Sequence, residues 1–266
     1  MGDKLRFSFI IPNYNKGSYI SECLSSIYNQ TYKNFEVIVV DDSSTDNSIE
    51  EIKKFPVDKV LITNRRQAGG ARNAGMKCAT GDYIVFLDSD DYLTNDKVLE
   101  NLANTIKDED IIFLNFTKIR LDLTEREMID LEGDLAFKIE NTEFLGAPTK
   151  CFKRKLIKDI LFPECKRYED MCFTLEALCK AESYTSFNDS FFIYRIVPNS
   201  NVTSPFTEET MVDIFEEFLK MYRLGVKYPK YKTNLMGRIK KGCLPLRLEV
   251  LDKLMETGEN TYKDYF

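Results

Sequence analysis

Three aspartates, Asp88, Asp90 and Asp91, directly follow the apolar run 83–87. A short apolar run between a glycine and a group of charges is typical of a buried strand in a parallel sheet. Such sheets bind ligands outside the carboxyl ends of their strands. Side chains two positions apart on an extended segment point to the same side, so Asp88 and Asp90 could share one hard cation while Asp91 faces away. This pattern predicts a divalent metal that carries a phosphate.

The same aspartates have a second interpretation, because acidic residues are common before helices. They could cap a helix that the apolar spacing predicts over 95–106. Glu169 and Asp170 raise the same question, since a helical pattern of apolar residues follows them. The local sequence leaves both alternatives open at both places.

The chain contains no histidine, which excludes Ser-His-Asp and Cys-His nucleophile systems built from its own residues. Any base must therefore be a carboxylate, a lysine, a tyrosine or a thiolate. The seven cysteines include no Cys-x-x-Cys pair. Without histidine partners, they are typical of reduced, mostly buried thiols rather than of zinc ligands.

Strand-like apolar runs alternate with helical patterns, which indicates βαβ units and a parallel sheet. The strands are expected at 7–11, 35–40, 60–62, 83–87, 111–114 and 191–195. Pro12 should end the first strand, because proline cannot continue a central ladder. The acidic, hydroxyl-rich segment 41–46 should lie at the same edge of the sheet as the aspartates after 87.

Gly69 and Gly70 precede a helical pattern, and they could form either a flexible turn or a loop that contacts a ligand. The segment 64–75 does not match the Gly-x-Gly-x-x-Gly fingerprint of dinucleotide-binding folds. It also lacks the Gly-Lys-Ser/Thr of a phosphate-binding Walker loop. Both of those nucleotide-binding classes are therefore disfavoured.

A chain of 266 residues with 43% hydrophobic content can bury a substantial core, as one large domain or two small ones. Its net charge of −6 argues against a general nucleic-acid binder. No run of about 18 apolar residues is present, so we expect a cytoplasmic protein or one peripheral to the cytoplasmic face of a membrane. Residues 223–247 hold no Asp or Glu among their Lys, Arg and Tyr residues. This segment could dock on an anionic membrane or be a solvated face.

Six segments, taken in order, resemble the family 2 glycosyltransferases of the GT-A fold. They are 8–15, 30–32, 36–46, 71–75, 81–91 and 168–170. The resemblance covers about 7–200 and implies an α/β fold with a mostly parallel, Rossmann-like nucleotide-binding sheet flanked by helices. It implies a catalytic domain over 1–205, with a nucleotide-sugar half over about 1–115 and an acceptor half over about 116–205. Outside the resemblance, the helical spacing of apolar residues after 207 and the basic segment 223–247 predict a helical, partly basic extension over 206–266.

The resemblance also implies how the donor is held. The loop that contains Pro12, Tyr14 and Asn15 would bind the base and ribose of a nucleotide-sugar together with Asp42. Uridine diphosphate is the most common carrier in the family. Arg72 would add a contact to the nucleotide.

In the same way, Asp88 and Asp90 would be the Asp-x-Asp of the family. Asp90 would bind Mn²⁺ or Mg²⁺ bridging the diphosphate, with Asp88 towards the ribose or the metal, and Asp170 would be the general base. Many relatives have a histidine shortly after Tyr-Arg, where this chain has none. Phosphate contacts from Arg195 and Ser200 would remain.

The resulting prediction is an inverting glycosyltransferase that moves a sugar to a hydroxyl of a glycan, glycolipid or glycoconjugate. A non-catalytic module that binds sugar nucleotides is one alternative. A nucleotidyltransferase is another, but it would need a basic, phosphate-gripping loop near the amino end. The segment 12–16 does not resemble such a loop.

Overall fold

The computed structural model describes residues 4–64, 67–120, 123–127, 133–142, 145–163, 165, 167–197 and 208–242. One sheet runs through this part of the chain, in the strand order β3-β2-β1-β4-β8-β6-β9-β5, and β7 pairs with β6 outside that path. The strands are β1 (Phe7–Asn13), β2 (Phe35–Asp41), β3 (Lys59–Ile62), β4 (Tyr83–Phe86), β5 (Tyr92–Leu93), β6 (Ile111–Arg120), β7 (Leu123–Glu127), β8 (Lys150–Lys153) and β9 (Tyr184–Arg195).

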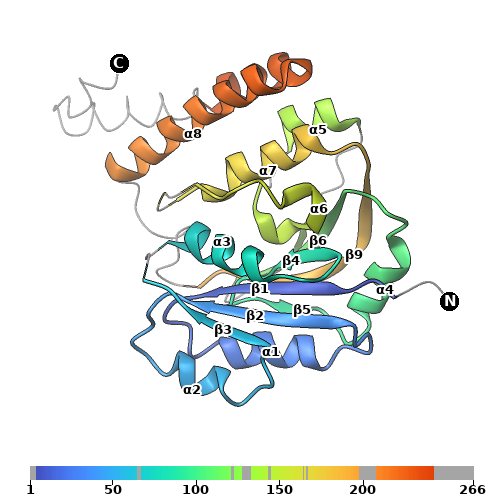
Figure 1. Ribbon diagram of the computed structural model, residues 1–266, viewed down its shortest axis with the longest axis vertical. Helices are drawn as coiled ribbons and strands as arrows, with labels where there is room; N and C mark the ends of the chain where they lie inside the picture. Colours follow the sequence, from blue (N-terminus) through green and yellow to red (C-terminus); the bar gives the residue numbers. More distant parts are fainter. Residues whose placement is uncertain are drawn as a thin grey trace.

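Helices cover both faces of this sheet (Figure 1). Helices α1 and α2 lie on one face, α3, α6 and α7 lie on the other, and α8 forms an outer layer beyond α7. The helices are α1 (Ile20–Tyr28), α2 (Ser48–Ile52), α3 (Ala68–Cys78), α4 (Val98–Thr105), α5 (Leu135–Asn141), α6 (Arg154–Ile157), α7 (Glu169–Lys180) and α8 (Glu208–Lys227), with 3-10 turns η1 (Ala147–Thr149) and η2 (Pro229–Tyr231). Residues 232–242 are also helical.

The predicted α/β fold is confirmed. Strands β1, β2, β3 and β4 are mutually parallel, as the βαβ pattern indicated. The other half of the sheet is mixed, because β8 runs antiparallel to β4 and to β6. Strands β6 and β9 are longer than predicted, since they pair with each other in parallel along most of their length. In the described part of the chain, no helix is long and apolar enough to cross a bilayer.

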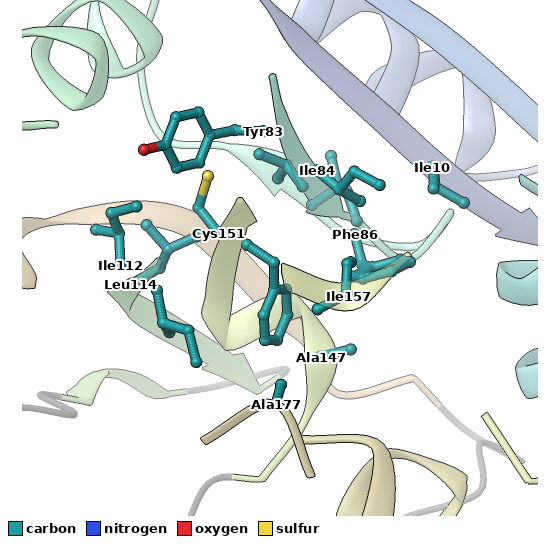
Figure 2. Close-up of a cluster of buried hydrophobic side chains, with 14 of the residues drawn as sticks. Ile10, Tyr83, Ile84, Phe86, Ile112, Leu114, Ala147, Cys151, Ile157 and Ala177 are labelled. Atoms are coloured by element: carbon teal, nitrogen blue, oxygen red, sulfur yellow. The ribbon is translucent and has the colours of Figure 1, made fainter. Parts of the chain in front are cut away.

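A cluster of aromatic rings joins β4 to the helices above it. The ring of Phe86 lies edge-on to Phe152, Phe162 and Phe173, at centroid distances of 6.1, 5.3 and 5.9 Å. Figure 2 shows side chains from β4, β6, β8, α6 and α7 meeting in this part of the core. Burying one such side chain contributes roughly 1.5–3 kcal/mol. The cluster therefore packs β8 and α7 against β4.

Pro12 does not end β1, contrary to the sequence prediction. The strand continues through Pro12, which pairs with Val40 of β2. Backbone groups alternate between the two neighbouring strands: the carbonyl of Ile10 accepts from the Leu87 amide on the β4 side, and that of Asn13 accepts from the Asp42 amide on the β2 side. The backbone groups of Pro12, like those of Ile10, face the β4 side of the strand. However, β4 pairs with β1 only up to Ile10. The missing N–H of proline therefore costs no ladder bond.

The two glycines at 69 and 70 also differ from their prediction as a turn or loop. Both lie in the first turn of α3 and are buried. A Cβ on Gly69 would stand 2.9 Å from the Pro163 carbonyl oxygen and 3.2 Å from Cγ of Glu169. Glycine is needed here because α3 approaches the backbone of another segment closely.

Candidate active site

The carboxyl ends of β1, β2 and β4 bring the predicted site segments to one edge of the sheet. Ile10 of β1 lies level with Ile38 of β2 and with Phe86 of β4. The residues that follow these three strands are therefore neighbours in space. This confirms the expectation that the acidic segments 41–46 and 88–91 share an edge.

The loop after β1 is tied to the loop after β2. Asn15 has a left-handed backbone with φ of 50°. Its side-chain oxygen accepts from the Thr45 backbone amide at 2.8 Å, and its backbone amide donates to the Ser44 hydroxyl at 2.9 Å. The neighbouring side chain of Tyr14 is 52% exposed. Fixing the loop in this way leaves an aromatic ring accessible at the edge of the site.

Asp42 is buried at the base of the same region. Its Oδ1 accepts from the Thr63 hydroxyl at 2.9 Å, and its Oδ2 accepts from the Gln67 amide at 2.8 Å. These bonds connect the loop after β2 to the segments on either side of residues 65–66. The carboxylate is thereby held in one orientation.

The three aspartates after β4 lie in three different environments. They form a turn rather than an extended segment, because the Asp91 amide donates to the Asp88 carbonyl. Asp88 Oδ1 accepts from Arg72 Nη2 at 2.9 Å, and Asp90 Oδ2 accepts from Lys16 Nζ at 2.6 Å. Asp88 and Asp90 remain partly exposed, at 32% and 16% of their side chains.

Asp91, as predicted, faces away from the other two. Its side chain is buried and its Oδ1 accepts from the Arg195 amide at 2.9 Å. Burial, with the charges of Asp88 and Asp90 as smaller contributions, raises the pKa of Asp91 well above its usual range. Helix α4 begins only at Val98, and no side chain caps it. The alternative that the aspartates cap this helix is therefore wrong.

Arg72 connects the acidic turn to α7. Its guanidinium is buried and binds Asp88 through Nη2, while Nη1 binds Glu169 at 2.7 Å and Asp170 at 3.1 Å. Its Cζ also lies 5.5 Å from the centre of the Phe162 ring. Burial opposes the charge of this group, but the surrounding carboxylates outweigh it and raise the pKa of Arg72. A planar guanidinium suits this role because it can serve several carboxylates at once.

Asp170 lies in the first turn of α7, which follows Tyr168 with its left-handed φ of 65°. Its Oδ2 accepts from the Ala147 amide of η1 at 3.2 Å. Burial raises the pKa of Asp170 to about 7, while Arg72 and the Ala147 amide lower it. Residues 169–170 do begin α7, but no side chain caps this helix, and both carboxylates bind Arg72 instead.

Arg195, at the end of β9, lies beside the acidic turn. Its Cζ lies 5.2 Å from the ring centre of Tyr19 and 4.8 Å from that of Tyr92, and its Nη2 binds Glu22 at 2.8 Å. The structure thus places it near Asp91 but gives it protein partners of its own. Ser200 lies outside the described residues, and its phosphate contact stays a prediction.

Sequence reasoning missed two participants in this site. The sequence assigns no role to Lys16, and it assigns Glu169 none beyond a helix start and the family segment 168–170. Each acts through a partner far along the chain, since Lys16 and Asp90 are 74 positions apart and Arg72 and Glu169 are 97 apart. No local pattern marks such pairs.

The carboxylate oxygens of Asp88 and Asp90 suit a hard cation that takes its further ligands from a substrate. The described residues contain no group of three or more metal-ligating side chains that could hold an ion alone. Two carboxylates are nevertheless what Mg²⁺ commonly takes from a protein, with phosphate and water filling the other positions. Asp88 and Asp90 therefore fit a metal that arrives with a diphosphate.

Residues 8–164, which are more than half of the chain, match the family model described as glycosyl transferase family 2. The chain belongs to this family. The glycosyltransferase is 29% identical over 238 residues to the glycosyltransferase GlyG of Streptococcus pneumoniae serotype 4, an alignment that covers 80% of this chain and 78% of GlyG.

This glycosyltransferase also resembles the poly(ribitol-phosphate) β-N-acetylglucosaminyltransferase TarS of Staphylococcus aureus, with 32% identity over 203 residues. That alignment covers 71% of the present chain but only 35% of TarS, so the chain spans about a third of the length of that relative. The crystal structure of TarS 1–349 in complex with UDP-GlcNAc superposes with a TM-score of 0.71 at 28% identity, over 82% of this chain and 67% of the other. The predicted family and GT-A fold are confirmed.

Proposed function

We propose that this glycosyltransferase moves a sugar from a uridine diphosphate donor to a hydroxyl of a glycan or glycolipid, with inversion at the anomeric carbon. The Arg72 network is the observation on which the proposal chiefly rests. One guanidinium binds Asp88 of the acidic turn and Asp170 of α7. A donor-binding carboxylate and a candidate base therefore lie on either side of a single cation.

The donor half of the proposal is supported by the loops at the ends of β1 and β2. The exposed ring of Tyr14 is suited to stack on a base, and the Asp42 carboxylate is held beneath the same edge. Uridine is the base we favour, because a relative with the same fold was crystallised with UDP-GlcNAc.

Asp90 and Asp88 would hold Mn²⁺ or Mg²⁺ in the complex with donor. When bound, such an ion neutralises charge on the departing diphosphate. Lys16 and Arg72 already place positive charge beside the two carboxylates. These two side chains would also meet the negative charge of the donor.

Asp170 is the group we assign as the general base. A carboxylate with a pKa near 7 is suited to remove a proton from an acceptor hydroxyl at neutral pH. The hydroxyl would attack the anomeric carbon from the side opposite the diphosphate, which inverts the configuration. This route forms no covalent intermediate with the protein, so it requires none of the histidine-dependent nucleophiles that the chain lacks.

Calorimetric titration of UDP tests the donor site before any acceptor is known. We expect UDP binding that depends on Mn²⁺, is weakened at least about tenfold by a chelator, and is equally weak in Asp90→Ala with or without metal. Asp159→Ala, which removes an exposed carboxylate elsewhere, is the matched control and should bind UDP as the unaltered protein does. Metal-independent binding of equal strength in all three proteins would contradict the assignment of 88–90.

Hydrolysis or transfer of the bound sugar separates the enzyme from a non-catalytic module. With UDP-GlcNAc and UDP-glucose as probes, we expect release of UDP that depends on metal and on Asp170. A protein that binds UDP with metal but releases none from any nucleotide-sugar would support the binding module instead. Pyrophosphate release from a nucleoside triphosphate would support the nucleotidyltransferase.

A further inference from the structure

The carboxyl half of α8 presents an apolar and cationic face to solvent. Leu219, Tyr222 and Val226 are 57%, 51% and 61% exposed. Residues three and four positions apart lie on one side of a helix, so these side chains form a single stripe together with the exposed Arg223. We call this set of four the α8 face.

The opposite side of α8 explains why this stripe is not part of the core. Met221 and Leu224 are buried, and the buried Glu217 accepts from the Cys172 amide of α7 at 3.2 Å. The helix is therefore already anchored by its inner side. In Figure 1 it forms the layer farthest from the sheet, with α7 between them. Leu219, Tyr222 and Val226 lie outside the hydrophobic core cluster of the described residues.

The charge around the α8 face differs from that of the rest of the protein. Residues 218–242 contain eight Lys and Arg and no Asp or Glu, in a chain whose net charge is −6, and the exposed Glu216 lies one turn before Leu219. Three of the eight pair with glutamates, because Lys220, Lys227 and Lys241 bind Glu217, Glu176 and Glu140. Arg223, Lys230, Lys232 and Lys240 are exposed. The segment therefore keeps an excess of positive charge after its ion pairs are counted.

We propose that the α8 face, with Lys230 and Lys232 of the segment that follows the helix, docks on an anionic lipid surface. Cations attract such a surface over about a Debye length, and apolar side chains between them enter the boundary between headgroups and acyl chains. The combination of both kinds of side chain distinguishes this partner from a soluble polyanion, which would gain nothing from Leu219 and Val226. The inference is independent of the proposed donor and base.

A second copy of the chain is the competing occupant, and the charge argues against it. Most self-association is two-fold symmetric, so it would place Arg223 and its neighbouring cations close to the same cations of the partner copy. Like charges brought together in this way oppose association. A lipid surface of opposite charge has no such cost.

Co-sedimentation of the full chain with vesicles tests the proposal. We expect binding to phosphatidylcholine vesicles that contain phosphatidylglycerol and little binding to phosphatidylcholine alone. The triple variant Arg223→Ser/Lys230→Ser/Lys232→Ser should bind the anionic vesicles at least about tenfold more weakly, since each cation near such a surface contributes roughly fivefold. The double variant Leu219→Ser/Val226→Ser should also bind several-fold more weakly.

Matched controls come from other parts of the surface. Lys53→Ser/Lys97→Ser/Lys107→Ser removes three exposed cations elsewhere, and Val60→Ser/Ile62→Ser removes two exposed apolar side chains of β3. Both should bind vesicles as the unaltered protein does. All four variants should keep the unaltered affinity for UDP, which separates a failure of this proposal from a failure of the donor site.

Three results would overturn the proposal. Equal binding to neutral and anionic vesicles, or none to either, excludes the charge-dependent surface. Anionic binding that falls in the cationic variant but not in Leu219→Ser/Val226→Ser indicates a general polyanion site. A dimer in sedimentation velocity without lipid that dissociates in Leu219→Ser/Val226→Ser indicates that a second copy covers the face.

Discussion

Arg72 of α3 and Asp170 of α7 are 98 positions apart in the sequence, and their side chains lie 3.1 Å apart in the structure. The same guanidinium binds Asp88 at 2.9 Å. A buried arginine therefore connects the proposed metal-binding turn with the proposed base. Because α3 and α7 pack on the same face of the sheet (Figure 1), the fold rather than a local motif creates this connection.

Asp170→Asn should abolish most of the transfer while leaving the donor site intact. Loss of a general base typically lowers kcat by about 10²–10⁴-fold. The amide keeps the size of the side chain, so UDP affinity in the presence of Mn²⁺ should change by less than about threefold. Initial rates with a nucleotide-sugar and calorimetry with UDP measure the two effects. Asp159→Asn is the surface control, and an unchanged kcat in Asp170→Asn would remove this residue from the mechanism.

The rate should rise with pH through about 7. Burial raises the pKa of Asp170 to about 7, and only the deprotonated carboxylate can accept a proton. Below that pH, log kcat/KM should therefore fall by about one unit per pH unit. A rate that stays flat from pH 5 to pH 8, measured at saturating metal, would contradict this assignment.

Arg72→Gln should move this profile to higher pH, since the guanidinium lowers the pKa of Asp170. Arg72→Lys retains a positive charge and should restore part of the shift, although an ammonium cannot reproduce the three ion pairs of the guanidinium. Rate profiles of both variants, with their folding checked by circular dichroism, measure the effect. An acidic limb at the same pH in all three proteins would show that Arg72 does not act on the base.

Lys16→Met should strengthen the binding of Mn²⁺ alone. Lys16 Nζ lies 2.6 Å from Oδ2 of Asp90, so a metal ion must compete with this ammonium for the carboxylate. A partly exposed ion pair contributes about 0.2–1 kcal/mol, which corresponds to an increase in affinity of up to about fivefold. Electron paramagnetic resonance of free Mn²⁺, titrated with protein in the absence of nucleotide, measures this affinity. Lys54→Met, which breaks the Lys54–Glu51 pair, is the control; weaker metal binding in Lys16→Met would contradict the competition.

Gly75→Ala should destabilise the fold. A Cβ at this position would stand 2.5 Å from Cγ2 of Ile10, and overpacking of this kind costs about 1–3 kcal/mol. Gly225→Ala is the matched control, because its Cβ would meet Lys232 at an ordinary 3.5 Å. Alanine also favours a helix over glycine by about 1 kcal/mol, so this second change should be neutral or stabilising. Urea unfolding of both variants gives the comparison, and equal midpoints would show that α3 can move away from β1.

The apolar runs determined most of the sheet in advance, because buried parallel strands need continuous apolar sequence whatever surrounds them. The order of six short segments was enough to predict the family. The predicted parallel strands were enough to place Asp42, Asp88 and Asp90 at one edge of the sheet. Where the prediction was wrong, a neighbouring strand or helix was the reason. Pro12 continues β1 because β4 has already ended beside it. Gly69 lies inside α3, where Pro163 and Glu169 leave no room for a side chain, so the glycine serves close packing rather than a turn.

The sequence alone predicted which residue types the site contains, and only the tertiary structure decided how they are paired. Asp88, Asp90 and Asp91 are the same residue type within four positions. Yet Asp88 binds Arg72, Asp90 binds Lys16, and Asp91 is buried and accepts from the Arg195 backbone amide. Their differences arise from burial and from charges supplied by β9, by α3 and by the loop after β1. Such contacts join residues about 16 to 104 positions apart, and the energy of an ionisable group depends on these surroundings rather than on its neighbours in the chain.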